Sequence, residues 1–122
     1  MPGAPLEADP DCLFCRIVAG EIPSRRAFED DLVVAFHDVA PRSPTHVLII
    51  PRRHIASAAE LSEADGPLLG RMVAVANQVA REQGIAEQGY RLVSNVGAWG
   101  GQTVFHLHLH LMGGRPFTWP PG

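Results

Sequence analysis

The chain has 122 residues, of which 46% are hydrophobic, and this suits the core of one domain. The net charge of -3 with neutral histidines provides no basic field to attract nucleic acid or an anionic membrane, and no apolar run is long enough to cross a bilayer. These properties favour a cytoplasmic protein without nucleic-acid or membrane partners. The first eleven residues include three prolines. We therefore expect a flexible tail over 1–11 and a single domain over 12–122.

The predicted domain opens with the only two cysteines of the chain, Cys12 and Cys15, at C-x-x-C spacing. In a reducing cytoplasm this spacing indicates metal or redox chemistry more often than a structural disulfide. The alternative is that both are reduced cysteines packed as small apolar residues.

Apolar runs between acidic or glycine-rich turns predict the strands. A short strand near Ala27, an acidic turn and a strand over 32–36 indicate a hairpin. The aliphatic run 46–51 predicts a buried strand. Near the end of the chain, a glycine-rich loop separates predicted strands over 90–95 and 104–112.

One long helix is predicted between these groups of strands. Its apolar residues recur at steps of three and four: Leu68, Leu69, Met72, Val73, Ala76, Val79 and Ala80. Gly84 is placed to end the helix. Its start is open, because Ser62 with Asp65 resembles a capping box, whereas Pro67 suits the first turn of a helix that begins later. The order of strands, helix and strands predicts an α+β fold with a five-stranded, mostly antiparallel sheet.

Histidine alternates with leucine over residues 106–111, so a strand would place His106, His108 and His110 on one face and the leucines against the helix. An exposed polar face is the simplest interpretation, but three imidazoles in register make chance a poor explanation. A single metal bound by all three would require the outer rings, about 13 Å apart along a strand, to lean fully inward. The third interpretation is chemical: a central imidazole nucleophile with flanking imidazoles that orient it and donate protons.

The motif "HLHLHLM" resembles the signature of the histidine triad superfamily. The stretches "FEDDLVVAFHDVAP", "THVLIIPRRHI", "GYRLVSNVG", "GGQTVFHLHLHLMGGR" and "WPPG" extend the resemblance, from Cys12 to Gly122, to its Hint branch of nucleotide-binding proteins. The resemblance implies an α+β fold with a long helix and a short N-terminal helix. It also implies a homodimer joined through a continuous sheet.

The resemblance implies that His108 attacks the α-phosphorus of a purine nucleotide, which forms a nucleotidyl-histidine that water hydrolyses. His110 and His46 are expected to assist at the phosphate, and Asp38 to hold the ribose hydroxyls. The residues expected on the phosphate side are Asn95, Gly101, Gln102 and Thr103. Thr103 is also expected to act in catalysis, where many relatives have serine. The expected apolar walls around the base are Phe14, Ile17, Phe36 and Val39. The first three would be ordinary core residues in any fold.

Zinc is the cofactor that the resemblance implies. Bacterial relatives bind it with a C-x-x-C pair and two histidines, which correspond here to Cys12, Cys15, His54 and His106. Such a zinc ion would be structural, and the chemistry should not require it.

The function favoured by the resemblance is hydrolysis of the P–N bond of purine nucleoside phosphoramidates, such as AMP joined to an amine or to lysine. Hydrolysis of dinucleoside polyphosphates is the first alternative, and the terminal "GGRPFTWPPG" favours the phosphoramidate. A non-catalytic nucleotide-binding scaffold is the second alternative. The intact triad argues against it, because binding alone requires no nucleophile.

Overall fold

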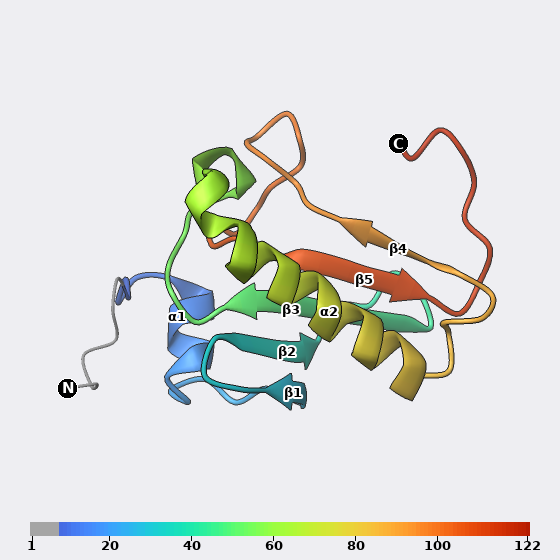
Figure 1. The fold of residues 1–122 in the computed structure, drawn as a ribbon, viewed down its shortest axis with the longest axis horizontal. Helices are drawn as coiled ribbons and strands as arrows, with labels where there is room; N and C mark the ends of the chain where they lie inside the picture. Colours follow the sequence, from blue (N-terminus) through green and yellow to red (C-terminus); the bar gives the residue numbers. More distant parts are fainter. Residues whose placement is uncertain (1–7) are drawn as a thin grey trace.

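The computed structural model describes residues 8–122, so the first seven residues of the predicted tail lie outside the described range. Its elements in chain order are α1 (Leu13–Val18), β1 (Arg26–Glu29), β2 (Val33–His37), β3 (Thr45–Pro51), the 3-10 turns η1 (Ala58–Glu60) and η2 (Glu63–Asp65), α2 (Gly66–Glu82), β4 (Tyr90–Val93) and β5 (Leu109–Gly113). Within the described range the five strands form one sheet in the order β1-β2-β3-β5-β4, and every pairing is antiparallel. The predicted α+β fold, with one long helix and a short N-terminal helix, is confirmed (Figure 1).

Helices cover both faces of the sheet, and alternate residues along each strand point to opposite faces. On one face, α2 packs against Val33, Val47 and Ile49 of the central strands and against the three leucines Leu107, Leu109 and Leu111. This contact confirms the predicted position of the leucines. On the other face, α1 packs against residues one position along the same strands, Val34, Phe36, Leu48 and Ile50. All the chemistry described below lies on the α1 face.

The start of α2 combines both signals seen in the sequence. Ser62 and Asp65 form a capping box, but the box caps the 3-10 turn η2, and α2 follows with Pro67 in its first turn. Gly84 lies just beyond the last turn at φ +76, a left-handed conformation that glycine adopts at little cost, and so ends the helix as predicted. No helix within residues 8–122 has the length and apolar character needed to cross a bilayer.

The segment 104–112 differs from the prediction of one long strand. Regular pairing begins only at Leu109, where β5 lies between β3 and β4, and ends at Gly113. Residues before Leu109 form bends, although Leu107 N–H still donates to the carbonyl of Ile55 at 2.6 Å. The strand predicted from the alternation of side chains begins too early in the chain. Alternation indicates which face a side chain occupies, and it does not indicate whether the backbone is paired.

Residues 9–11, which the sequence analysis placed in a loose tail, form a turn attached to α1. The carbonyl of Asp9 accepts the Cys12 N–H at 3.0 Å, and its carboxylate accepts the Asp11 N–H at 2.9 Å. The N–H of Asp9 also lies 3.4 Å from the sulfur of Cys15. An aspartate that bonds its own following backbone is a frequent turn former, and here it brings the chain onto the first cysteine.

Candidate functional site

The three triad histidines lie on the α1 face, but each occupies a different environment. His106 is fully buried and directs its ring at the two cysteines. His108 is buried, and its ring lies between those of Phe14 and His110, at centroid distances of 5.2 and 4.9 Å. His110 contacts His46 across the β3–β5 pairing. The three rings therefore share one face as predicted, but they do not converge on one point.

The hydrogen bond at Nδ1 fixes the tautomer of His108. That nitrogen lies 2.7 Å from the carbonyl oxygen of His106. A carbonyl can only accept, so Nδ1 must carry the proton, which leaves the Nε2 lone pair available for attack. A central imidazole oriented by its neighbours is the arrangement that the alternating histidines predict.

A second hydrogen-bond chain fixes the tautomers of His46 and His110. The backbone N–H of Arg42 donates to Nδ1 of His46 at 3.0 Å, so the proton of His46 must be on Nε2. That Nε2–H donates to Nδ1 of His110 at 2.9 Å. The proton of His110 is therefore on its own Nε2, from which it can be donated to a bound group. We call this chain of backbone amide and two imidazoles the histidine relay.

Burial keeps the histidine relay neutral near pH 7. It lowers the pKa of His46, against the opposing effect of the Asp38 carboxylate. Burial also lowers the pKa of His110 to about 4, and the neighbouring His108 and His46 lower it further. Neutral rings are required for the donor and acceptor assignments above, so the electrostatics and the hydrogen-bond geometry agree.

Asp38 completes this part of the site directly after β2. One carboxylate oxygen accepts the Ala40 N–H at 2.8 Å, so the residue forms a turn directly after its strand. The other oxygen lies 3.4 Å from Nε2 of His46. The side chain is only one-fifth exposed.

The ligand atoms of Asp38, His46 and His110 all lie within 4.8 Å of one another, a spacing that could hold a metal ion. The hydrogen bonds argue against that use. A metal on Nε2 of His46 would require the proton to move to Nδ1, which already accepts the Arg42 N–H. This group is therefore better suited to hydrogen bonding than to metal binding.

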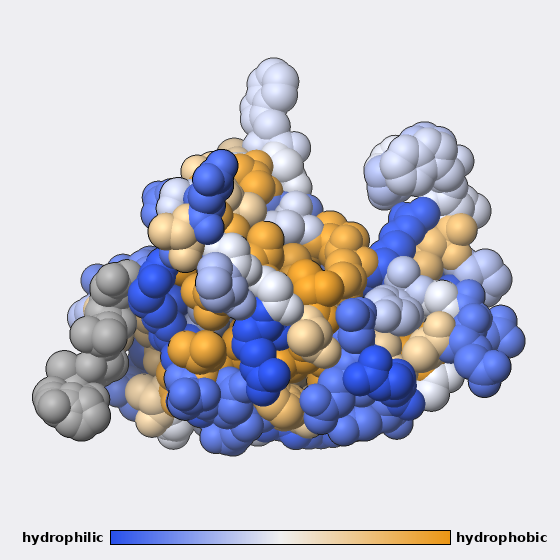
Figure 2. Space-filling view, viewed as in Figure 1, coloured by the Kyte–Doolittle hydropathy of each residue, from blue (hydrophilic) through white to orange (hydrophobic). Residues whose placement is uncertain are grey.

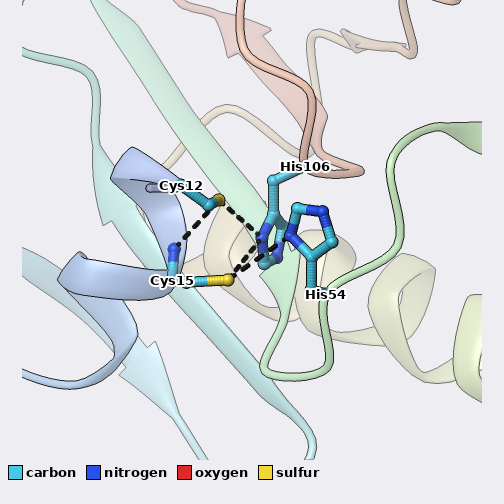
Figure 3. A group of neighbouring side chains, drawn as sticks. All are labelled: Cys12, Cys15, His54 and His106. Atoms are coloured by element: carbon cyan, nitrogen blue, oxygen red, sulfur yellow. Dashed lines mark hydrogen bonds between the residues drawn. The ribbon is translucent and has the colours of Figure 1, made fainter. Parts of the chain in front are cut away.

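Cys12, Cys15, His54 and His106 form the second cluster, which we call the thiol–histidine cluster (Figure 3). Their four ligand atoms also lie within 4.8 Å of one another. Nδ1 of His106 is 3.3 Å from the sulfur of Cys12 and 3.5 Å from that of Cys15, and Nδ1 of His54 is 3.4 Å from the Cys15 sulfur. The residues come from α1 and its N-cap, from the loop after β3 and from the segment before β5, so the fold brings together distant parts of the chain.

The donors of this cluster fit a metal ion. Nε2 of His106 lies 2.8 Å from the carbonyl of Pro51 and must carry the proton, so the Nδ1 lone pair faces the sulfurs. Burial lowers the pKa of His106 to about 4, which keeps this ring neutral. Burial also raises the pKa of Cys15 to about 11, so a thiolate there requires a compensating cation. Two thiols and two imidazoles are a tetrahedral ligand set, and the cluster could hold a metal ion.

The glycine-rich loop is held rigidly beside the triad. Gly101 has φ +84, and a Cβ on Gly100 would lie 2.3 Å from the carbonyl oxygen of Val96, so both positions require glycine. Asn95 donates to the carbonyl of Gly100 at 2.7 Å.

Gln102 is buried within this loop. Its amide nitrogen donates to the carbonyls of Ala56 and Val104, and its amide oxygen accepts the Gly97 N–H. In this arrangement its side chain braces the loop, whereas Thr103 is exposed.

The residues expected to surround the base differ in exposure. Phe14, Ile17 and Phe36 are buried in the cluster that packs α1 on the sheet, and Phe14 meets the rings of Phe36 and His108 edge-on. Val39 is fully exposed on the loop after β2. The first three thus have the core packing named as the alternative, and Phe14 also contacts the ring of His108.

A cavity of about 510 Å³ lies beside the thiol–histidine cluster and the glycine-rich loop. Its lining includes His54 and Thr103, which were selected from the sequence, and Leu13, Val104 and Phe105, which were not. Leu13 and Phe105 are about half exposed, and an isolated apolar residue carries no sequence signal that marks it as part of a site. The backbone groups of Arg42 and Pro51 were also missed, because a backbone hydrogen bond does not depend on the residue type.

Comparison with known proteins finds close relatives of this chain in sequence and in structure. A family profile described as the HIT domain matches residues 19–117. The chain is 48% identical over 106 residues to the purine nucleoside phosphoramidase of Escherichia coli K12, covering 87% of this chain and 89% of that protein. It is 50% identical over 112 residues to an uncharacterised HIT-like protein of Synechocystis, covering 92% and 97%. The crystal structure of a HIT family hydrolase from Legionella pneumophila superposes with a TM-score of 0.90 at 51% identity, covering 92% of this chain and 100% of that one.

Proposed function

Because the chain belongs to the HIT domain family, we propose that it hydrolyses the P–N bond of purine nucleoside phosphoramidates through a nucleotidyl intermediate on His108. The observation that carries this proposal is the 2.7 Å contact between Nδ1 of His108 and the carbonyl of His106. It leaves Nε2 unprotonated, as a nucleophile requires. The E. coli relative named a purine nucleoside phosphoramidase supports the choice of substrate class.

The proposed reaction has two steps. Nε2 of His108 attacks the α-phosphorus, and the electron pair of the broken P–N bond goes to the leaving nitrogen, which takes a proton from water. Water then attacks the phosphorus of the nucleotidyl-histidine, returns the electron pair to Nε2 and releases a proton. The Nε2–H of His110 donates to a phosphoryl oxygen throughout, because the histidine relay holds that proton in place.

The remaining nucleotide contacts are proposed from family likeness together with position. Asp38 binds the ribose hydroxyls, and the glycine-rich loop offers the Thr103 hydroxyl to the phosphate. Gly101, whose N–H donates to the carbonyl of Ala98 at 3.0 Å, lets the backbone approach the phosphate closely because it has no side chain. Asn95 and Gln102 support that loop. Phe14, Ile17 and Phe36 form the base wall, to which Val39 can contribute only if the exposed loop folds over the base.

A direct comparison of substrates tests the proposal. The protein is assayed side by side on an adenosine phosphoramidate and on a diadenosine polyphosphate at equal concentration. We expect a higher kcat/KM for the phosphoramidate. A higher value for the polyphosphate would assign the protein to the alternative activity, and no turnover of either would favour a nucleotide-binding scaffold.

We also propose that the metal held by Cys12, Cys15, His54 and His106 is zinc, because two thiolates and two imidazoles are a typical structural zinc site. When bound, zinc would neutralise the thiolates and hold α1 against the segment before β5. The chain's own residues carry out the proposed chemistry without it.

A homodimer is proposed through the edge strand β4. Apolar surface gathers between α2 and β4 in Figure 2, and Leu69 of α2 and Leu92 of β4 are each 37% exposed. An open sheet edge beside apolar surface favours pairing with a second copy. Light scattering on the protein and on Leu92→Asp tests this, since only the variant should be monomeric.

A cytoplasmic location stays a prediction.

A further inference from the structure

The segment after β5 is packed against the loop that follows β2. Gly114 has φ +93, and a Cβ there would lie 2.7 Å from Cβ of Pro44, so glycine permits this close approach. The next residue, Arg115, donates from Nη2 to the carbonyl oxygen of Arg42 at 3.1 Å. The two segments are thus joined by packing and by one side-chain hydrogen bond.

The guanidinium of Arg115 is held in position by an aromatic ring. It lies 4.3 Å from the centroid of Phe117, and the guanidinium of Arg91 from β4 lies 5.2 Å from the same centroid. Arg91 also donates to the carbonyl of Thr118. Both arginines therefore anchor the C-terminal segment through Phe117, but only Arg115 also bonds the loop after β2.

Arg42 is the residue whose backbone sets the histidine relay. Its N–H donates to Nδ1 of His46, and its carbonyl accepts from Arg115. The two groups belong to the peptide planes on either side of Arg42, so both planes are held, one by the relay and the other by the C-terminal segment. This loop is exposed at Ala40, Pro41 and Arg42 and lies outside the sheet. The two bonds of Arg42 add to the Asp38–Ala40 turn bond and to the Ser43–Thr45 bond, which hold the loop on either side of Arg42.

We propose that Arg115 is a positioning residue for the histidine relay, acting through the backbone of Arg42. By holding the Arg42 carbonyl it keeps the N–H directed at His46, which keeps the proton of His46 on Nε2 and that of His110 on Nε2. The C-terminal segment is thereby coupled to the donor that faces the phosphate. The inference rests on the proposed function, in that the relay serves turnover.

The test compares Arg115→Ala with the matched variant Arg91→Ala, since each removes one guanidinium from Phe117 and only the first breaks the bond to Arg42. Nitrogen-15 chemical shifts of the imidazoles report the tautomers of His46 and His110 in each variant. We expect mixed tautomers of both rings in Arg115→Ala and unchanged tautomers in Arg91→Ala. The kcat for the phosphoramidate should fall about 3- to 10-fold in Arg115→Ala with little change in KM, as for a weakened neutral hydrogen bond between the Arg42 N–H and His46.

Arg115→Lys keeps one donor and should partly restore the Nε2–H tautomer of His46. Unchanged tautomers in Arg115→Ala, or equal disturbance in Arg91→Ala, would overturn the proposal. The tautomers can be measured in a protein that turns over no phosphoramidate, so failure of the proposed function would be recognised separately. Light scattering and the melting temperature of each variant exclude an effect of altered assembly or folding.

Discussion

The thiol–histidine cluster and the group of Asp38, His46 and His110 are alike in dimensions and opposite in chemistry. Both lie on the α1 face, both use one triad histidine, and in both the ligand atoms fall within 4.8 Å of one another. In the first, the carbonyl of Pro51 accepts a hydrogen bond from the Nε2–H of His106, which leaves the Nδ1 lone pair facing two thiols. In the second, the N–H of Arg42 occupies the lone pair of His46 and leaves a proton facing His110. The backbone group behind each imidazole, and not the spacing, decides between metal ligand and hydrogen-bond donor.

His108 lies between these two groups and contacts both. Its Nδ1–H donates to the carbonyl of His106, whose side chain belongs to the thiol–histidine cluster. Its ring lies 4.9 Å from that of His110 in the histidine relay. Variants in each group should therefore have separable effects on chemistry and on stability.

Removing the nucleophile should have the largest effect. His108→Ala should lower kcat at least about 10⁴-fold, as for other nucleophiles removed from two-step hydrolases, while AMP still binds because both neighbouring groups remain. Steady-state rates and calorimetric titration with AMP measure the two properties. His37→Ala, a histidine outside both groups, is the matched control. Rapid quench of the wild type with labelled substrate should trap the nucleotidyl group on His108, and an adduct on His106 or His110 would refute the mechanism.

Loss of the relay donor should be the next largest effect. His110→Ala removes the Nε2–H that faces the phosphate and should lower kcat about 10²- to 10³-fold, the range for one preorganised donor. Some turnover remains because the nucleophile is intact. Single-turnover rates measure the effect, and a decrease of less than twofold would remove His110 from the proposed chemistry.

Asp38 distinguishes sugar recognition from simple turn formation. A carboxylate that binds the ribose hydroxyls loses a partner when the 2′-hydroxyl is absent, so kcat/KM for a 2′-deoxy substrate should be about 10- to 100-fold lower, as for hydrogen bonds to charged groups. Asp38→Asn should reduce the ratio of kcat/KM for the ribose substrate to kcat/KM for the deoxyribose substrate. Equal kcat/KM values for ribose and deoxyribose substrates would leave Asp38 only the turn bond to Ala40.

Variants of the thiol–histidine cluster should change stability more than chemistry. Protein purified without chelator or added metal should contain about one zinc per chain. Cys12→Ser/Cys15→Ser should lose the metal and melt at a lower temperature, while a nucleotidyl adduct still forms on His108. Elemental analysis and thermal unfolding measure both properties. A metal-free wild type, or a double variant with unchanged melting temperature, would contradict the zinc assignment.

The relay should also make the free energy of unfolding depend on pH. The folded pKa of His110, about 4, lies below its ordinary value of 6.5, so the unfolded chain takes up the proton first. The free energy of unfolding is therefore highest above pH 6.5 and decreases as the pH falls towards 4. The titration of this ring lowers it by about 1 to 2 kcal/mol at pH 5. Urea unfolding at pH 7 and pH 5 should show a smaller decrease for His110→Gln than for the wild type. Identical decreases would argue against a depressed pKa.

The sequence predicted those features that depend on the type of residue and its period. The leucines of the triad segment alternate, and they pack on α2 as expected. The cysteine spacing, together with family likeness, selected His54 and His106, which the structure brings beside both thiols. The start of β5 was not predictable, because backbone pairing stops at Leu109 while the side-chain alternation continues upstream. Nor was the role of Arg42, since its contribution to the relay is a peptide N–H that any residue except proline would supply.

The point at which β5 begins has a mechanical consequence. His110 lies inside the strand, paired with Leu48 on one side and Val93 on the other, whereas His108 lies one residue before the first paired position. His110 is fixed by two neighbouring strands and keeps its place. His108, the proposed nucleophile, lies just outside the pairing and can move towards phosphorus and back without breaking a sheet hydrogen bond. In hydrogen-exchange terms, the sheet protects the amides of β5, and that protection ends before His108, the residue proposed to carry the covalent intermediate.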